Sequence, residues 1–336
     1  MPAQGESRRA LVTGITGQDG SFLADLLLEY GYRVTGMVRR SPADSLGASE
    51  HLRDRLELVS CNLLDVDGLR RLVDQAQPHE LYHLAAPSFV PDSWERPGET
   101  LAAIAGSTAA LLEAVREHGD QTRLFVAGSG AVFGAVEESP QRESTPCRPE
   151  TPYATAKLAA QQLVAQVRAR DGIFACCGIL YNHESERRPA SFVPRKVSRA
   201  AAAIKLGLAK EVILGDLNAV RDWSFAGDIV RGAWLMLRQD TADDYILASG
   251  EGHSVGDLVE VAFSYVGLNA RGHVRVDPNL VREPESTPRI GDATRARERL
   301  GWRPTLTFEE LIRRMVDADL RILREVASRR QDPLSG

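Results

Sequence analysis

The chain has 336 residues, of which 43% are hydrophobic and 26% charged, and its formal net charge is −5 at pH 7. This composition is that of a globular protein with one large domain or two small ones, and the acidic balance argues against nucleic acid as a partner. The N-terminal residues contain no apolar segment of a signal peptide, and no apolar run approaches the ~18 residues of a membrane span, so we expect a cytoplasmic protein with no membrane partner.

The first half of the chain alternates short apolar runs with stretches of helical periodicity. Strand-like runs cover residues 9–14, 32–38, 56–61, 80–86, 124–128 and 174–180. Helical spacing is found between them at residues 21–32, 66–76, 108–119 and 151–167. Because strands and helices that alternate in this way form βαβ units, the sequence predicts an α/β fold of the Rossmann type with a doubly wound parallel sheet.

The second half of the chain carries more loops between its helical patterns. From about Asn182 onward, helices are predicted at residues 197–208, 229–237, 255–267 and 306–326. We therefore predict a nucleotide-binding Rossmann domain over residues 1–181, with parts of the C-terminal half interleaved, and a smaller α/β substrate lobe over residues 182–330.

The four cysteines lack the paired CxxC spacing of a metal or redox motif. Cys176 and Cys177 lie within an apolar run that is typical of a buried strand. We expect these two and also Cys61 and Cys147 to be reduced thiols in a reducing compartment, and no metal site is predicted.

A glycine-rich turn, GITGQDG, follows the first predicted strand and opens the first predicted helix. Its GxxGxxG spacing lets the backbone approach a pyrophosphate, whose charge the helix N-terminus would meet. The alternative is a strand–helix turn that merely needs a positive φ angle. The predicted cofactor contacts in this turn are Gly14, Thr16, Gly17, Gln18, Asp19 and Gly20.

The residues after the second strand bear on the choice between NAD and NADP. An acidic residue there would bind a ribose 2′-hydroxyl, whereas this chain has Arg39 and Arg40, which suit a 2′-phosphate. NADP is therefore favoured over NAD, and the alternative is a solvated basic loop. Further along, we predict that Asn62 and Leu63 meet the adenine ring and that Leu84, Ala85 and Ala86 line the nicotinamide side.

A serine, a tyrosine and a lysine form the candidate catalytic set. Ser129 stands at the end of the fifth strand-like run, and Tyr153 and Lys157 are one turn apart on one face of a predicted helix. The lysine charge favours the phenolate form of the tyrosine, which can then exchange a proton with a substrate hydroxyl during hydride transfer. Ser129 can hydrogen-bond the same substrate oxygen. The alternative is a helix with a packed tyrosine and an exposed lysine.

Together these motifs resemble those of the extended short-chain dehydrogenases/reductases, and the chain is especially similar to the GDP-mannose 4,6-dehydratase family. The similar stretches cover residues 10–32, 38–41, 179–188, 192–208, 214–240, 243–255 and 281–285. The resemblance implies an NADP-dependent enzyme that acts on a nucleotide sugar, with a GDP-linked sugar as the expected substrate. It also implies a homodimer or homotetramer built through helices at residues 108–115 and 156–167.

The resemblance extends to residues of the binding site. The positions that match those holding the GDP portion in the family are Asn182, Val193, Lys196, Arg221, Arg282 and Glu285. Ser88 and Ser129 complete the predicted substrate site, and His183 and Arg188 match positions that line the cofactor. A diphosphate requires converging cations, and Lys196, Arg221 and Arg282 could supply them.

One departure from the family pattern changes the expected chemistry. The family carries a glutamate two residues after the hydroxyl residue, as the base that removes the C5 proton before water is eliminated, and this chain has Ala131 there. General-base assistance is worth ~10²–10⁴ in rate. We therefore predict a 4-epimerase or 4-ketosugar reductase in preference to a dehydratase. The other departures, which we interpret as a rebuilt sugar pocket, are Asn62, Pro87, Phe133, Pro194 and Val220.

Two alternatives remain open at this point. A dehydratase could use another base, such as Asp92 or Glu95. A noncatalytic nucleotide-sugar or NADP sensor could have kept the fold, although it would not need the serine, tyrosine and lysine. The sugar and the direction of hydride transfer are also open.

Overall fold

A seven-stranded parallel sheet forms the centre of the molecule. The computed structural model describes residues 7–280 and 287–331. In the order β10-β6-β5-β4-β1-β2-β3, every strand pairs in parallel with its neighbours. The strands are β1 (Arg9–Thr13), β2 (Arg33–Val38), β3 (Glu57–Ser60), β4 (Glu80–His83), β5 (Arg123–Ala127), β6 (Ala175–Leu180) and β10 (Tyr245–Leu247).

This architecture confirms the predicted Rossmann-type doubly wound α/β fold. The first six strands follow the order 3-2-1-4-5-6 across a switch point between β1 and β4, where α/β sheets bind their ligands. All six were predicted from their apolar runs. The seventh strand, β10, was not predicted, and it is contributed by the second half of the chain.

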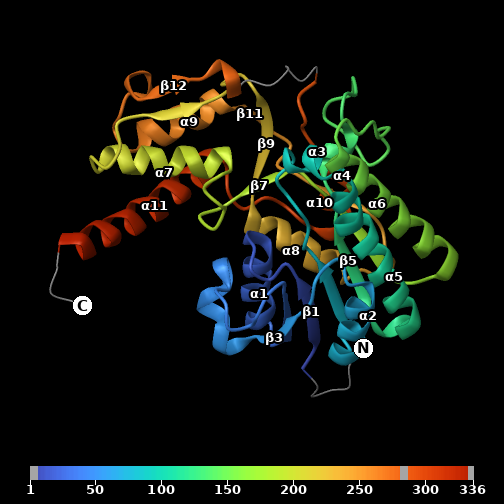
Figure 1. The fold of residues 1–336 in the computed structure, drawn as a ribbon. Helices are drawn as coiled ribbons and strands as arrows, with labels where there is room; N and C mark the ends of the chain where they lie inside the picture. Colours follow the sequence, from blue (N-terminus) through green and yellow to red (C-terminus); the bar gives the residue numbers. More distant parts are fainter. Residues whose placement is uncertain (1–6, 281–286, 332–336) are drawn as a thin grey trace.

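Helices cover both faces of the sheet. Successive side chains of a strand point to opposite faces of the sheet. In β1, Ala10 and Val12 therefore belong to the core on one face and Leu11 to the core on the other. The first core is covered by α1 (Gln18–Glu29) and α8 (Ala226–Met236), and the second by α2 (Val66–Ala76), α5 (Ser107–His118) and α6 (Pro152–Asp171). Figure 1 shows α1 and α8 on one side of the sheet and α2, α5 and α6 on the other.

A second lobe has its own core. It is formed by the three-stranded sheet β11 (Gly252–Ser254), β9 (Val220–Phe225) and β7 (Asn182–Glu184), by the pair β12 (Val274–Val276) and β8 (Val212–Leu214), and by α7 (Val193–Lys205), α9 (Val255–Tyr265) and α11 (Phe308–Gln331). The three helices bury Val197, Leu258, Phe263, Leu311 and Met315 between them. In Figure 1 they lie together at the upper left, with β9 and β7 leading back to the large sheet.

Shorter elements complete the described chain. They are η1 (Gly47–Arg55), α3 (Asp92–Glu95), α4 (Pro97–Leu101), the π-helical turn η2 (Ala102–Gly106), η3 (Gly119–Gln121), η4 (Gly130–Phe133), η5 (Ala270–Gly272), η6 (Pro278–Leu280) and α10 (Thr294–Leu300). Cys61, Cys176 and Cys177 are buried, Cys147 is half-buried, and all four are free thiols. Within the described ranges, none of the helices has the length and apolar character to span a membrane.

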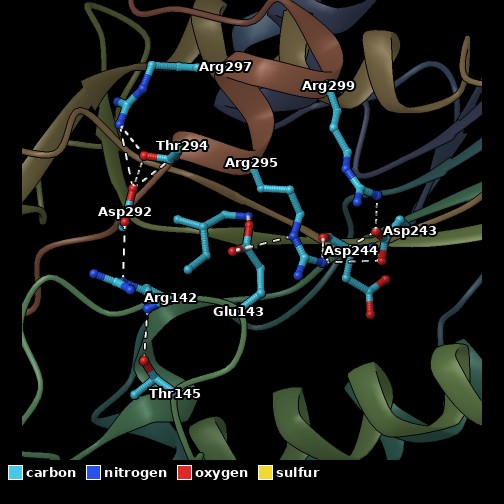
Figure 2. A network of polar contacts seen from close by, with 11 residues as sticks. Arg142, Glu143, Thr145, Asp243, Asp244, Asp292, Thr294, Arg295, Arg297 and Arg299 are labelled. Atoms are coloured by element: carbon cyan, nitrogen blue, oxygen red, sulfur yellow. Dashed lines mark hydrogen bonds and ion pairs between the residues drawn. The ribbon is translucent and has the colours of Figure 1, made fainter.

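An ion-pair network covers the open edge of the sheet at β10. Glu143, from the loop after η4, accepts a hydrogen bond from the Ile246 backbone N–H at 3.0 Å, and its carboxylate lies 3.8 Å from the Arg295 guanidinium. Arg295 and Arg299 also pair with Asp243, as Figure 2 shows. The network therefore shields an edge-strand amide and ties the loop to α10.

Candidate active site

The predicted cofactor and catalytic residues follow the carboxyl ends of adjacent strands. The glycine turn follows β1, Arg39 and Arg40 follow β2, and Ser129 follows β5. The remaining segments, residues 62–63 and 84–86, follow β3 and β4. Since the strands are parallel, all of these segments lie along one edge of the sheet.

The backbone of the glycine turn leaves no room for side chains at two of its glycines. Gly14 has a φ angle of 75°, and a Cβ there would lie 2.9 Å from the Ala85 nitrogen. A Cβ on Gly20 would lie 2.2 Å from the Gly14 carbonyl oxygen. Gly17 is the N-cap of α1 and has no side chain that could cap the first amides of the helix, which an α-helix leaves without intrahelical partners. A positive φ angle alone therefore does not explain the turn, and its open amides fit a pyrophosphate.

Asp19 and His183 form a charged pair between the glycine turn and the second lobe. The His183 Nε2 atom lies 2.9 Å from a carboxylate oxygen of Asp19, and Nδ1 lies 2.7 Å from the Tyr181 carbonyl oxygen. Both partners only accept hydrogen bonds, so both ring nitrogens donate and the imidazole is protonated. Burial opposes its charge, yet the charge of Asp19 and the bond to it raise the pKa of His183.

The contact with His183 also changes the pKa of the Asp19 carboxylate. Burial alone would raise the pKa of Asp19, but the charge of His183 and the hydrogen bond from it lower this pKa to about 2. Gln18 supports the pair, because its amide nitrogen donates both to Asp19 and to the His183 carbonyl oxygen. The Arg188 guanidinium lies 3.3 Å from the Glu184 carboxylate, and its charge also contributes to the lowered pKa of Asp19. The structure thus brings together four of the predicted cofactor residues.

The two arginines after β2 are exposed, and neither forms an ion pair with any described residue. Thr16 is exposed as well, and its carbonyl oxygen accepts a bond from the Ala48 N–H of η1, which packs over the turn. Asn62 is exposed and folds back onto the Leu64 N–H at 3.1 Å, whereas Leu63 is half-buried. Cationic side chains are therefore available where the predicted 2′-phosphate would lie.

The lysine of the candidate catalytic set is buried. Lys157 is 6% exposed, its ammonium donates to the Ala127 carbonyl oxygen at 2.7 Å, and it lies 5.8 Å from the centre of the Tyr153 ring. The alternative of an exposed lysine is therefore wrong. Thr151 caps α6 by accepting a bond from the Ala154 N–H at 3.1 Å, which fixes the start of the helix next to Tyr153.

Ser129 stands two residues after the carbonyl that holds Lys157. Its hydroxyl accepts a hydrogen bond from the Ala131 N–H at 3.2 Å, which leaves its proton for an acceptor in the site. Ala131 is half-buried and offers only a methyl group. Phe133 is 1% exposed and packs in a core with Tyr181, so this departure from the family pattern belongs to the core and not to the sugar pocket.

The loop after β4 lies against Tyr153. Leu84, Ala85 and Ala86 are half-buried, and Ala86 packs with Tyr153 on a small cluster of Ile104, Ala156 and Ala160. Pro87 and Ser88 are exposed. A small hollow beside Lys157 is lined by His83, Ala85, Ala86, Ile104, Thr108, Val126, Ala127 and Ala160. The predicted nicotinamide side and the catalytic lysine are therefore neighbours.

The predicted substrate residues come from β7, α7 and β9. Asn182 is exposed and lies opposite Trp223 in the pairing of β7 with β9. Arg221 lies two residues before Trp223 in β9, and its guanidinium donates to the Val220 carbonyl oxygen. Val193 is 40% exposed at the start of α7. Lys196 is half-buried and pairs with no carboxylate among the described residues. Arg282 and Glu285 lie outside the described residues.

Other residues bear on the remaining predictions. Asp92 and Glu95, the candidate replacement bases, are exposed on the short helix α3. Of the departures from the family pattern, Pro194 is buried in the first turn of α7 and Val220 is half-buried at the start of β9.

Sequence reasoning missed Thr13, His83 and Ser107, which form hydrogen bonds with one another behind the site. The sequence signal for His83 was its place in the run HLAA at residues 83–86, but only residues 84–86 of this run were predicted to lie in the site.

The chain is similar to known nucleotide-sugar enzymes. The family profile described as GDP-mannose 4,6 dehydratase matches residues 11–315. GDP-mannose 4,6 dehydratase 1 of Arabidopsis thaliana is 44% identical over 325 residues, which cover 93% of this chain and 90% of the plant protein.

Solved structures share the fold. UDP-glucose 4-epimerase of Thermus thermophilus, in complex with NAD, has a TM-score of 0.80 at 25% identity, with 93% of this chain and 98% of that chain covered. RMD of Pseudomonas aeruginosa, complexed with NADPH, has a TM-score of 0.78 at 24% identity, with 94% and 99% covered.

Proposed function

Because the chain belongs to the GDP-mannose 4,6-dehydratase family of short-chain dehydrogenases/reductases, we propose that it is an NADP-dependent enzyme that oxidises or reduces C4 of a GDP-linked hexose. Ser129, Tyr153 and Lys157 are its catalytic residues. The cofactor binds to the domain at residues 1–181 and to the interleaved residues His183 and Arg188. The nucleotide sugar extends from Ser88 and Ser129 into the lobe at residues 182–330. The reaction is a 4-epimerisation or a 4-ketosugar reduction.

One observation carries the choice of reaction. The hydroxyl, phenol and ammonium groups are kept, but the side chain two residues after Ser129 is the methyl group of Ala131. A methyl group cannot remove the C5 proton, and the loss of a general base costs ~10²–10⁴ in rate. Redox chemistry at C4 needs no such base. Asp92 and Glu95 are exposed, which does not favour either as a replacement.

The chemistry of the three residues follows from their positions. When bound, the nicotinamide ring supplies or accepts the hydride at C4. Tyr153 takes the proton from the C4 hydroxyl during oxidation and returns it to the C4 oxygen during reduction. Lys157, anchored on the Ala127 carbonyl, stabilises the phenolate by its charge. Ser129 donates its free proton to the same sugar oxygen and so orients C4.

The choice of NADP rests on Arg39 and Arg40. The structural neighbours named above are described with NADPH in one case and NAD in the other, so they support either cofactor. Two exposed guanidinium groups after β2 favour the cofactor that carries a 2′-phosphate. The GDP assignment rests on the family and on Lys196, whose charge no described carboxylate neutralises.

The purified protein should be incubated with GDP-mannose and NADP, and the products analysed by mass spectrometry. We expect no product that has lost one water. An unchanged mass with inverted C4 supports the epimerase, and turnover that requires a 4-ketosugar and NADPH supports the reductase. A robust dehydrated product from the wild type contradicts the proposed reaction, and binding without any turnover supports a sensor.

The variant Ala131→Glu provides a second arm of this experiment. It restores a carboxylate two residues after Ser129, and we expect detectable elimination from GDP-mannose if C5 and C6 are presented to it. Ala131→Gln is the matched control, because it has the same length and no basic oxygen. Equal elimination by both variants would contradict a general-base role at this position.

A further inference from the structure

His83 is buried behind the candidate active site and is bonded at both ring nitrogens. It is the last residue of β4 and is 4% exposed. Its Nδ1 atom lies 2.9 Å from the Thr13 hydroxyl oxygen, and its Nε2 atom lies 3.0 Å from the Ser107 hydroxyl oxygen. The ring therefore connects the end of β1 to the start of α5.

The surrounding hydrogen bonds define its protonation state. The Thr13 oxygen already accepts bonds from the Leu84 and Ala85 N–H groups, both at 3.1 Å, so its single proton goes to His83 Nδ1. Ser107 donates its proton to the Ala103 carbonyl oxygen at 2.7 Å, so it accepts from His83 Nε2. The histidine is thus the neutral Nε2–H tautomer. Burial and the charge of Lys157 lower its pKa to about 3.

Through Thr13, His83 is linked to the contact between the glycine turn and the loop after β4. Thr13 immediately precedes Gly14, and its oxygen holds the amides of Leu84 and Ala85. The Gly14 and Ala85 backbones are in such close contact that a Cβ on Gly14 would lie 2.9 Å from the Ala85 nitrogen. A change in the Thr13 bonds would therefore move the loop at residues 84–86 relative to the glycine turn.

Through Ser107, His83 is linked to the surroundings of Lys157. Ser107 directly follows the π-helical turn η2 and bonds back to Ala103 within it. Wider turns of this kind occur frequently at functional sites. Ile104 of the turn and Thr108 of α5 line the hollow beside Lys157, together with His83 itself. The His83–Ser107 hydrogen bond therefore supports the residues that surround Lys157 in this hollow.

We propose that His83 is a positioning residue, which as a neutral Nε2–H donor holds both the loop at residues 84–86 and the turn beneath Lys157 in the arrangement that hydride transfer requires. The proposal rests on the function proposed above. It assigns different tasks to the two ring nitrogens: Nδ1, through Thr13, maintains cofactor affinity, and Nε2, through Ser107, maintains the alignment of Lys157.

Two variants separate these tasks. His83→Gln places an amide near the former Nε2 position and keeps the bond to Ser107, but it leaves the Thr13 hydroxyl without an acceptor. We expect it to weaken NADP binding about tenfold. His83→Asn places its amide near the former Nδ1 position and loses the Ser107 bond. We expect NADP affinity within about twofold of the wild type and a kcat lower by about tenfold or more.

His79, which immediately precedes β4 at the end opposite to His83, provides the matched control. The Nδ1 atom of His79 accepts a hydrogen bond from the Arg9 N–H at 3.0 Å, far from the catalytic edge of the sheet. His79→Gln should change neither NADP affinity nor kcat. Equal effects of His83→Gln and His83→Asn on both quantities, or none on either, would overturn the proposal.

Nitrogen-15 NMR of the wild-type protein gives an independent test that needs no variant to fold. The His83 ring should show a protonated Nε2 and an unprotonated Nδ1, unchanged from pH 5 to pH 8. A protonated Nδ1, or titration in this range, would refute the assignment. Wild-type protein that binds no NADP in calorimetry would instead contradict the proposed function, so the two failures are distinguishable.

Discussion

At the scale of single residues, Lys157 is the best-defined member of the candidate catalytic set. A lysine ammonium has three protons to donate, and one is committed to the Ala127 carbonyl oxygen. The side chain is 6% exposed, so the other two protons can meet only groups inside the site. In the proposed function, the phenol of Tyr153 is the neighbouring group that this charge acts on. The single bond to β5 therefore aligns α6 with the turn that carries Ser129.

Replacing the Tyr153 hydroxyl tests its role as the proton carrier. We expect Tyr153→Phe to retain NADP and GDP-sugar binding but to lose turnover by about 10² or more, because it removes the exchanged proton and little packing. Steady-state kinetics and calorimetry measure the two effects separately. Tyr265→Phe, which removes an exposed hydroxyl on α9 that bonds Asp317, is the control. Near-normal turnover of Tyr153→Phe would exclude Tyr153 as the acid/base.

Arg39 and Arg40 should determine cofactor preference. We expect the wild type to bind NADP at least tenfold more tightly than NAD, which corresponds to about 1.4 kcal/mol. The double variant Arg39→Ala, Arg40→Ala should lose this preference while its NAD affinity stays unchanged, because only the 2′-phosphate contact is removed. Arg55→Ala, an exposed cation at the end of η1, is the control. Equal wild-type affinities in calorimetry would contradict NADP specificity.

At the scale of elements, a buried ion pair joins α7 to α11 in the second lobe. The Arg195 guanidinium donates twice to one oxygen of Asp319, at 3.1 and 2.8 Å, and Ser198 donates to the other oxygen at 2.7 Å. The two side chains are 7% and 0% exposed. Since α7 carries Val193 and Lys196, this pair also sets where the predicted substrate residues lie.

Breaking this pair should destabilise the protein strongly. Asp319→Ala leaves the Arg195 charge buried without a partner, which costs about 3–5 kcal/mol. Asp317→Ala, an exposed aspartate on the same helix, should cost less than about 1 kcal/mol. Urea unfolding followed by circular dichroism measures both. If the double variant Arg195→Met, Asp319→Leu were as unstable as Asp319→Ala, the uncompensated charge would not be the cause.

Elements with a clear apolar pattern could be predicted from the sequence, whereas β10 and η1 could not. The runs of β1 to β6 are apolar and end in turns, and the helices α1, α2, α5 and α6 repeat apolar residues at helical spacing. By contrast, β10 has only three residues, and η1 buries only Ser49 and Leu52, too few for a period. Pairing with β6 and packing on the glycine turn stabilise these two elements, and both contacts are long-range.

At the scale of the whole molecule, the candidate site depends on contacts between distant parts of the chain. Spacing within a motif indicated Tyr153 and Lys157, since four residues make one helical turn. No local pattern relates Thr13, His83 and Ser107 to one another. Thr13 meets His83 because β1 and β4 are neighbours in the sheet, and Ser107 meets His83 because α5 packs on the same sheet. The same holds for Asp19 and His183, which are separated by 164 residues.

The Asp19–His183 pair couples the two halves of the chain, so its titration should be visible in global stability. The pKa of Asp19 is lowered from 3.8 to about 2, so its contribution is present above pH 3.8 and is lost as the pH falls toward 2. The pKa of His183 is raised above 6.5, so its contribution is complete below pH 6.5 and is lost as the pH rises through the raised value. The pair should therefore stabilise the fold most between about pH 4 and pH 6.5.

Asp19→Asn tests this window in the protein without cofactor. The melting temperature of the variant should lie a few degrees below that of the wild type between about pH 4 and pH 6.5, because a hydrogen bond between charged groups contributes roughly 1–3 kcal/mol. The gap should narrow at higher pH, since a neutral imidazole has one N–H for the two acceptors Asp19 and Tyr181. Asp67→Asn is the matched control, because Asp67 occupies the same position in the first turn of α2 but is exposed. A gap that stays constant from pH 4 to pH 9 would mean that the charge of His183 does not hold the glycine turn against the second lobe.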